Sequence, residues 1–231
     1  MTEELRAKPQ ADAQEGRGRS SSFPRGREEF ARVLAFSDGL FAIAMTLLVV
    51  GVGVPMLSDG SDEGELLEAF GNLKHEILSF FISFAVIGRY WVAHHQFFAL
   101  LRAMDYRLVA INLVYLGFVA FLPFPTAVLG EYFENPISVA AYAVTVAIIS
   151  GLEVVMFRHA HRAGLLARAV PEPVYRWGRS VSSMPVVFMV LSIPVAFVSS
   201  LVAVVMWFAA VPAQVLILNR RKPADADEYL S

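Results

Sequence analysis

The chain has no cysteine and few charged residues, which make up 17% of its 231 residues. Without cysteine, disulfides and thiolate metal sites are excluded. A charged fraction this low, beside 56% hydrophobic residues, is untypical of a soluble domain. No Gly-rich phosphate loop and no Ser-His-Asp arrangement is found in a sensible context, so we expect no enzymatic activity and no nucleic-acid partner. We also expect no signal peptide, because the first 29 residues have no apolar core.

The chain contains several long apolar segments. Six of them approach the ~20 residues that cross a bilayer, at about residues 30–54, 67–101, 108–129, 137–157, 181–198 and 201–218. None alternates with period two, so strands are not expected. We predict an all-α polytopic membrane protein with six transmembrane helices in residues 30–220. A disordered cytoplasmic arm, residues 1–29, would precede them and a cytoplasmic tail, residues 221–231, would follow.

The connections between these segments alternate in charge. Lys and Arg occur before the first segment, after the second, after the fourth and in the tail. The connections after the first and third segments have Asp and Glu but no cation, and the one after the fifth is uncharged. Because cytoplasmic connections are enriched in Lys and Arg, both termini are predicted to be cytoplasmic.

Polar residues of three predicted helices fall in one layer near the cytoplasmic side. Asp38 lies ~12 Å along the first helix from Phe30, at 1.5 Å per residue. At the same depth the second and third helices contribute Trp91, His94, His95 and Asn112. A buried carboxylate is costly unless it is hydrogen-bonded or paired. We therefore interpret Asp38 as an anchor that holds the first helix against its neighbours.

The polar residues near this layer and in the following segments allow other assignments. His94 and His95 are adjacent, so they point ~100° apart on a helix and are not expected to bind one metal ion together. Glu153, in the inner half of the fourth helix, is either a proton relay or a partner of Arg158 or of a neighbouring helix. His159 and His161 are expected to be solvated in a basic loop.

An apolar stripe follows Asp38 along the first helix. Ile43, Leu47 and Val50 are spaced i, i+4, i+7 and share one face. Thr46 flanks this stripe, and the small residues Gly39 and Ala42 allow another helix to approach closely. Spacing alone does not distinguish a pore-lining stripe from one that faces lipid or packs against protein.

The segment RVLAFSD, residues 32–38, fits the R-x-x-x-F-S-D signature of the transmembrane protein 175 family. These proteins are lysosomal potassium channels and their prokaryotic homologues. The similarity continues through GLFAIAMTLLVV, and the WVAHH, LPFPT and LGEY stretches also resemble this family. The signature residues are Arg32, Phe36, Ser37 and Asp38.

The resemblance implies a potassium-permeable channel. A one-repeat chain is similar to the prokaryotic form, a homotetramer in the inner membrane that passes potassium ions, with no cofactor and no further metal. The first helix of each subunit would line a central pore, with Ile43, Leu47 and Val50 as its constriction. Thr46 would supply a hydroxyl group that flanks the pore. Val50 is shorter than the expected leucine. The signature residues would tie this helix to the Trp and His residues of the second.

A secondary transporter is the alternative. It would use Asp38, His94, His95 and Glu153 as proton-coupling or cation-coupling groups. Transporters commonly have helices broken near the middle of the membrane. We predict an unbroken first helix between Phe30 and Val54, which argues for the channel.

Overall fold

The computed structural model describes residues 22–55, 57 and 62–223. The chain is mostly helical, which confirms the predicted class. The elements in order are β1 (Ser22–Pro24), α1 (Glu28–Leu47), the 3-10 helix η2 (Leu48–Gly51), α2 (Glu63–Asn72), α3 (Lys74–Ala99), β2 (Ala103–Asp105), α4 (Tyr106–Phe121), α5 (Pro123–Glu131), α6 (Pro136–Arg162), α7 (Glu172–Ala196) and α8 (Ser200–Arg221).

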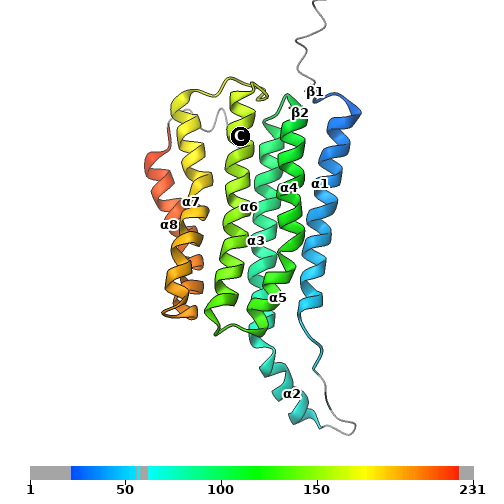
Figure 1. Cartoon of the computed structure of the whole chain (residues 1–231), viewed down its shortest axis with the longest axis vertical. Coiled ribbons are helices and arrows are strands. Elements are labelled where there is room, and N and C mark those ends of the chain that lie inside the picture. Colours follow the sequence, from blue (N-terminus) through cyan, green and yellow to red (C-terminus); the bar gives the residue numbers. More distant parts are fainter. Residues whose placement is uncertain (1–21, 56, 58–61, 224–231) are drawn as a thin grey trace, which may run out of the picture.

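The long helices run side by side as one bundle (Figure 1). Helix α6 packs against α4 and α5 on one side and against the α7–α8 hairpin on the other, while α1 packs against α3 and α4. Large buried side chains such as Phe41, Tyr115 and Tyr142 fill the space between these helices. Helix α2 extends beyond the bundle at the end opposite to β1 and β2 (Figure 1).

Within the described residues, five helical segments are long and apolar enough to cross a membrane. They are Glu28–Gly51, Lys74–Ala99, Tyr106–Glu131, Pro136–Arg162 and Glu172–Ala196. An apolar stretch at Ser200–Ala209 is shorter. The multi-pass architecture is thus confirmed, and a sixth span over α8 stays a prediction.

The prediction of one continuous helix over residues 67–101 is wrong. Helical geometry is interrupted at Leu73, between α2 and α3. Helix α2 begins at its own cap, where the Asp62 side chain accepts a hydrogen bond from the Glu65 amide at 2.9 Å. It has no buried residue, and Gly71 and Asn72 at its end are poor helix formers.

Three other boundaries also differ from prediction. The first helix is not unbroken to Val54, because α-helical geometry ends at Leu47 and the 3-10 turn ends at Gly51. The third is interrupted at Leu122, since Pro123 lacks an amide hydrogen. The fifth predicted helix starts at Glu172 and not near residue 181. Its first turns are polar, so a search for apolar residues does not include them.

A small sheet, which the sequence does not predict, lies at the end of the bundle that contains Arg25, Arg102 and Arg162. We call this the Arg-rich end. Strands β1 and β2 pair antiparallel, with Phe23 opposite Met104. The loop after α6 joins the α3–α4 link through the Arg102 amide and the Leu165 carbonyl at 2.9 Å. Residues 22–29, assigned to the disordered arm, therefore form β1 and the start of α1, whereas residues 1–21 lie outside the described residues.

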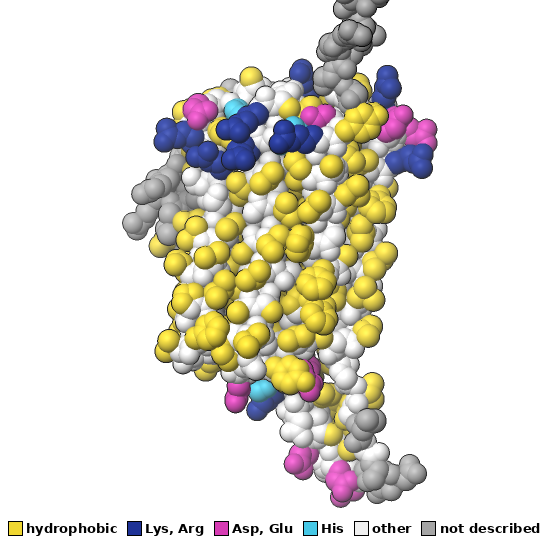
Figure 2. Space-filling model, in the orientation of Figure 1, with side chains coloured by type: hydrophobic (Ala, Val, Ile, Leu, Met, Phe, Trp, Pro, Cys, Tyr) yellow, Lys and Arg dark blue, Asp and Glu magenta, His cyan; other side chains and the backbone are white. Residues whose placement is uncertain are grey.

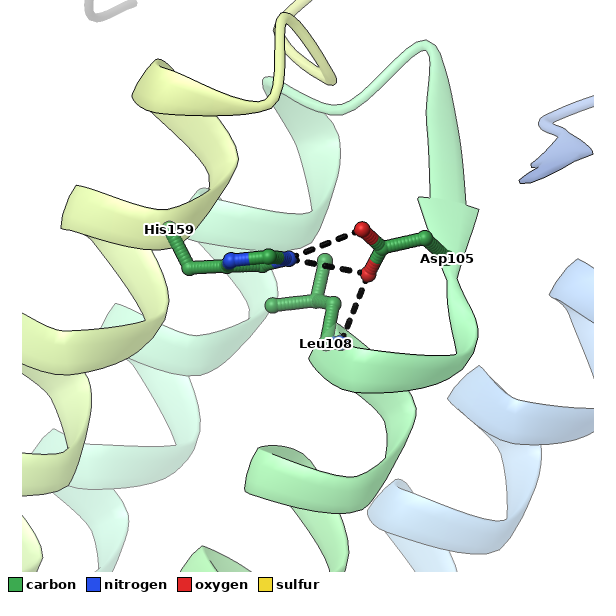
Figure 3. Close-up of polar contacts among 3 residues, drawn as sticks. All are labelled: Asp105, Leu108 and His159. Carbon is green, nitrogen blue, oxygen red and sulfur yellow. Dashed lines mark hydrogen bonds and ion pairs between the residues drawn. The ribbon is translucent and has the colours of Figure 1, made fainter. Parts of the chain in front are cut away.

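The expectation that His159 is a solvated residue of a loop is wrong. It lies on α6, and its Nε2 contacts the Asp105 carboxylate at 2.8 and 3.0 Å (Figure 3). Asp105 also caps α4 by accepting from the Leu108 amide at 2.7 Å. His161, also on α6, stacks on Tyr175 with ring centroids 3.9 Å apart. The pair His159–Asp105 thus fastens the end of α6 to the start of α4.

The two ends of the molecule differ in charge. Figure 2 shows Lys and Arg gathered, with several acidic residues among them, at the end near the small sheet, a broad hydrophobic band below them, and acidic residues on the far extension. Lys74, at the start of α3, is a cation near the acidic end. This distribution agrees with the alternation in the sequence, and the orientation in the cell stays a prediction.

Candidate functional site

Helix α1 presents two different faces. Its buried residues recur with helical spacing and are Phe30, Ser37, Phe41 and Ala44, followed by Leu48 in η2. This face packs on α3 and α4. Glu28 and Glu29 in the first turn suit the positive end of the helix dipole. The helix is therefore held against the bundle along one side only.

The predicted constriction residues lie on the other side. Ile43, Leu47 and Val50 are 55%, 44% and 76% exposed in the single chain, whereas neighbouring Leu48 is 2% exposed. Thr46 is exposed with them, and its hydroxyl donates to the Ile43 carbonyl at 2.8 Å. We call Ile43, Thr46, Leu47 and Val50 the exposed stripe. No residue in the described part of the chain covers it.

Two other predictions concern this face. Gly39 and Ala42 are exposed, and a side chain added at Gly39 would meet no atom within 4 Å. The close approach they permit is therefore not used by any other helix among residues 22–55 and 62–223. Phe36 of the signature is likewise 54% exposed, and Arg32 is exposed.

Ser37 begins a buried hydrogen-bonded relay through three helices. The Asn112 amide nitrogen on α4 donates to Ser37 Oγ at 3.1 Å. His94 Nε2 on α3 lies 2.9 Å from Asn112 Oδ1. Because an amide oxygen only accepts, His94 Nε2 must be the donor. Ser37 Oγ in turn donates to the Val33 carbonyl at 2.9 Å, so the direction of each bond is determined.

Aromatic rings surround the His94 imidazole. It stacks on Phe98 and Tyr115, with centroids 4.3 and 5.7 Å away, and meets the edge of Phe41 at 5.4 Å. His94 and Asn112 are each 1% exposed and Ser37 is 0% exposed. His94 Nδ1 is buried and has no hydrogen-bond partner among the described residues. The searched part of the chain has no group of three or more His, Cys, Asp or Glu residues suited to a metal ion.

Asp38 makes a separate and more exposed contact. Its Oδ1 accepts from Trp91 Nε1 at 3.0 Å. Asp38 is half-buried, and Trp91 is 39% exposed. His95, predicted beside them, is exposed, and its ring lies 5.9 Å from that of Trp91 without a hydrogen bond to Asp38. Of the four polar residues predicted to contact α1, His94 and Asn112 belong to the buried relay that begins at Ser37. Trp91 and Asp38 form what we call the exposed pair, and His95 bonds to neither group.

Glu153 lies apart from both groups. Its Oε1 accepts from the Tyr115 hydroxyl at 3.5 Å, and it does not form an ion pair with Arg158. With Arg89 it lines a cavity of about 220 Å³ between α3, α6 and α7. Tyr115 stacks on His94, so Glu153 is one aromatic ring away from the relay.

A second set of buried polar contacts, which the sequence pattern did not indicate, lies nearer the start of α3. Ser83 donates to the Tyr142 hydroxyl at 3.1 Å and accepts from Thr126 at 2.8 Å. Tyr90 pairs with Ser150 at 2.6 Å. The only signal in the sequence is the recurrence of Ser and Tyr on one face of an apolar helix, which does not identify partners.

Comparison with known proteins places this arrangement in a family. Residues 32–123 match the family model described as the endosomal/lysosomal potassium channel TMEM175. A protein named as a potassium channel from Streptomyces collinus is 36% identical over 177 residues, which cover 74% of this chain and 84% of that protein. A Bos taurus protein named as the endosomal/lysosomal proton channel TMEM175 is 37% identical over 97 residues, 40% of this chain and 20% of the relative.

A solved structure is also similar. The crystal structure of a lysosomal potassium-selective channel TMEM175 homolog from Chamaesiphon minutus aligns with a TM-score of 0.66 and 30% identity. The alignment covers 84% of this chain and all of that one. From the signature at the head of α1, the shared fold and the extent of these matches, it follows that the chain belongs to the TMEM175 family.

Proposed function

We propose that the protein is a potassium-permeable cation channel in which α1 from each of four copies lines a central pore. The observation that carries this proposal is the division of α1 into a packed face and an apolar face that none of the described residues covers. The naming of its relatives as potassium channels supports the choice of ion. The protein would act without enzymatic activity or a cofactor.

The exposed stripe would form the barrier to ions. Four copies of Ile43, Leu47 and Val50 facing one axis make apolar rings, which hold water poorly and gate by dewetting. Thr46 adds an acceptor to this surface: because its hydroxyl hydrogen is engaged by the Ile43 carbonyl, only its oxygen lone pairs face outward. Such an oxygen suits a cation and not an anion.

The buried relay and the exposed pair would set the rotation of α1. Ser37 and Asp38 are adjacent, so their side chains leave the helix ~100° apart. One is bonded to Asn112 on α4 and the other to Trp91 on α3. Two contacts in different directions resist rotation of the helix about its axis, which keeps the exposed stripe turned away from the bundle.

A transporter built on Asp38, His94, His95 and Glu153 is less well supported. Asp38 and His94 are engaged in separate hydrogen bonds, and Glu153 lies beyond Tyr115. The departure of α1 from α-helical geometry comes only after Leu47, toward its outer end, and not at the level of Asp38.

Single-channel recording in a planar bilayer tests the function. With unequal potassium concentrations on the two sides, we expect unitary current steps that reverse near the potassium equilibrium potential. A flux without unitary steps would favour a carrier. Cysteine at position 47 or 50 should permit block by water-soluble thiol reagents, whereas cysteine at position 48 serves as the buried control.

The same cysteine-free background tests orientation. We propose that the Arg-rich end faces the cytoplasm of a prokaryotic cell, which places both termini inside. A membrane-impermeant thiol reagent added to intact cells should label a cysteine at Asp62 and not one at Arg168. Labelling of both positions from one side would contradict this topology.

A further inference from the structure

The 3-10 helix η2, which continues α1, touches α5 closely at one glycine. A Cβ atom added at Gly51 would lie 3.0 Å from the Ala127 Cβ and 3.5 Å from the Ala127 Cα. Carbon atoms in optimal contact are ~3.5–4.0 Å apart, so a side chain fits at position 51 only if η2 or α5 moves. Gly51 therefore sets how closely η2 approaches α5.

Space, and not backbone conformation, distinguishes this glycine. The φ angle of Gly51 is outside the left-handed region, so alanine can adopt the same backbone conformation. A Cβ atom added at Gly39 or at Gly53 would meet no atom within 4 Å. Among the glycines of residues 28–55, the close contact is thus specific to Gly51.

Helix α5 is held more firmly than η2. Four of its nine residues are buried, among them Thr126 and Leu129, whereas the buried residue of η2 is Leu48. Thr126 Oγ1 donates to Ser83 Oγ on α3 at 2.8 Å, and a retreat of Ala127 from η2 would stretch this bond. When position 51 gains a side chain, we therefore expect η2 to move.

The geometry of η2 gives the direction of that movement. Side chains at i and i+3 of a 3-10 helix eclipse, so Leu48 and Gly51 lie on the same edge of η2. Leu48 faces the bundle and is 2% exposed, whereas Val49 and Val50 are 57% and 76% exposed. A displacement away from Ala127 therefore carries Val50 away from the bundle.

We propose that Gly51 is a positioning residue for the pore: its contact with Ala127 sets the distance of Val50 from the pore axis. This inference rests on the proposed function, in which the exposed stripe faces that axis. Ser37 and Asp38 would set the rotation of α1, and Gly51 sets the radial position of its far end. A displacement on the order of 0.5 Å restores a normal carbon–carbon contact. Because four copies move alike, the diameter of the Val50 ring falls by twice that amount.

Single-channel recording of the whole protein with a double-mutant cycle tests the proposal. Gly51→Ala should lower the unitary conductance severalfold, because a narrower apolar ring holds water less well. Ala127→Gly removes the Cβ atom that a side chain at position 51 would meet and leaves the Ala127 Cα position at 3.5 Å. Gly51→Ala combined with Ala127→Gly should therefore recover most of the wild-type conductance. Gly53→Ala is the matched control and should conduct like the wild type.

The recordings distinguish positioning from a merely structural role, because unitary conductance is measured only on channels that have assembled. Unchanged or raised conductance in Gly51→Ala, or a double variant as impaired as the single one, overturns the inference. If Gly51→Ala does not assemble, the double variant decides: assembly with wild-type conductance supports the contact, and a second failure to assemble overturns it. A wild-type protein without unitary steps contradicts the proposed function and this inference with it. Wild-type steps with an unaffected Gly51→Ala channel contradict this inference alone.

Discussion

Two faces of the helix formed by α1 and η2 meet opposite surroundings. On one face Ser37 is buried, and its hydroxyl accepts from Asn112, which in turn accepts from His94. On the other face Ile43, Leu47 and Val50 form a stripe of apolar side chains that no described part of the chain covers. The first face satisfies its polar groups internally; the second needs something outside the single chain, which we propose to be the other copies and the ion pathway.

The difference shows how hydrogen bonds on one face can orient a helix whose opposite face is mainly apolar. Hydrogen bonds need particular partners in particular directions, so they define the rotation of α1 at its inner end. Apolar contacts are not directional and would leave that rotation poorly determined. Substitutions on one face of α1 should therefore leave the other face intact.

The largest effect is expected at Asn112. Replacing it with Leu removes the bond to Ser37 and leaves the His94 Nε2–H without an acceptor in a buried site. We expect a loss of about 2–4 kcal/mol of stability and a failure to assemble. Thermal unfolding and size-exclusion chromatography in detergent measure both. Leu113→Ala, on the exposed side of α4, is the matched control; equal damage from both would show that the relay has no special role.

The exposed stripe should respond in conductance, not in stability. Ile43→Asn introduces a polar ring into the proposed constriction, which then holds water more readily. We expect a severalfold larger unitary conductance and weaker discrimination between potassium and sodium. Leu48→Asn buries an amide without a partner, so it should lower stability instead. If the two variants exchange these phenotypes in bilayer recordings and thermal unfolding, the pore face has been misassigned.

A smaller effect is expected at Asp38. Its contact with Trp91 is one half-exposed hydrogen bond, so Asp38→Ala should cost about 1–2 kcal/mol, less than the change at Asn112. Assembly should suffer more than permeation through the tetramers that form. Asp38→Asn keeps an acceptor for Trp91 and should preserve assembly. Stable Asp38→Ala tetramers with altered selectivity would instead identify Asp38 as a permeation residue.

The smallest effect concerns the Arg-rich end. His159→Gln disturbs the contact with Asp105, which is mostly buried, and should cost about 0.5–1.5 kcal/mol. Conductance should be unchanged, because this contact joins α6 to α4 and does not touch α1. Asp105→Ala should cost more, since it also removes the cap of α4. Chemical unfolding of the two variants side by side compares them.

Several features of this protein followed from local sequence alone. Apolar length predicted a helical membrane bundle, because spanning a bilayer requires about 20 apolar residues whatever the fold. The alternation of charge agreed with the concentration of Lys and Arg at one end of the bundle seen in Figure 2. The signature at residues 32–38 indicated the family, which the comparisons confirmed.

Tertiary structure decided which polar residues meet. The sequence placed Asp38, Trp91, His94, His95 and Asn112 in one layer, but depth says nothing about rotation around each helix axis. Packing turned His94 inward to Asn112 and its neighbour His95 outward, since adjacent helical residues diverge by ~100°. The same rotation separated Leu48, which is buried, from Leu47, which is exposed.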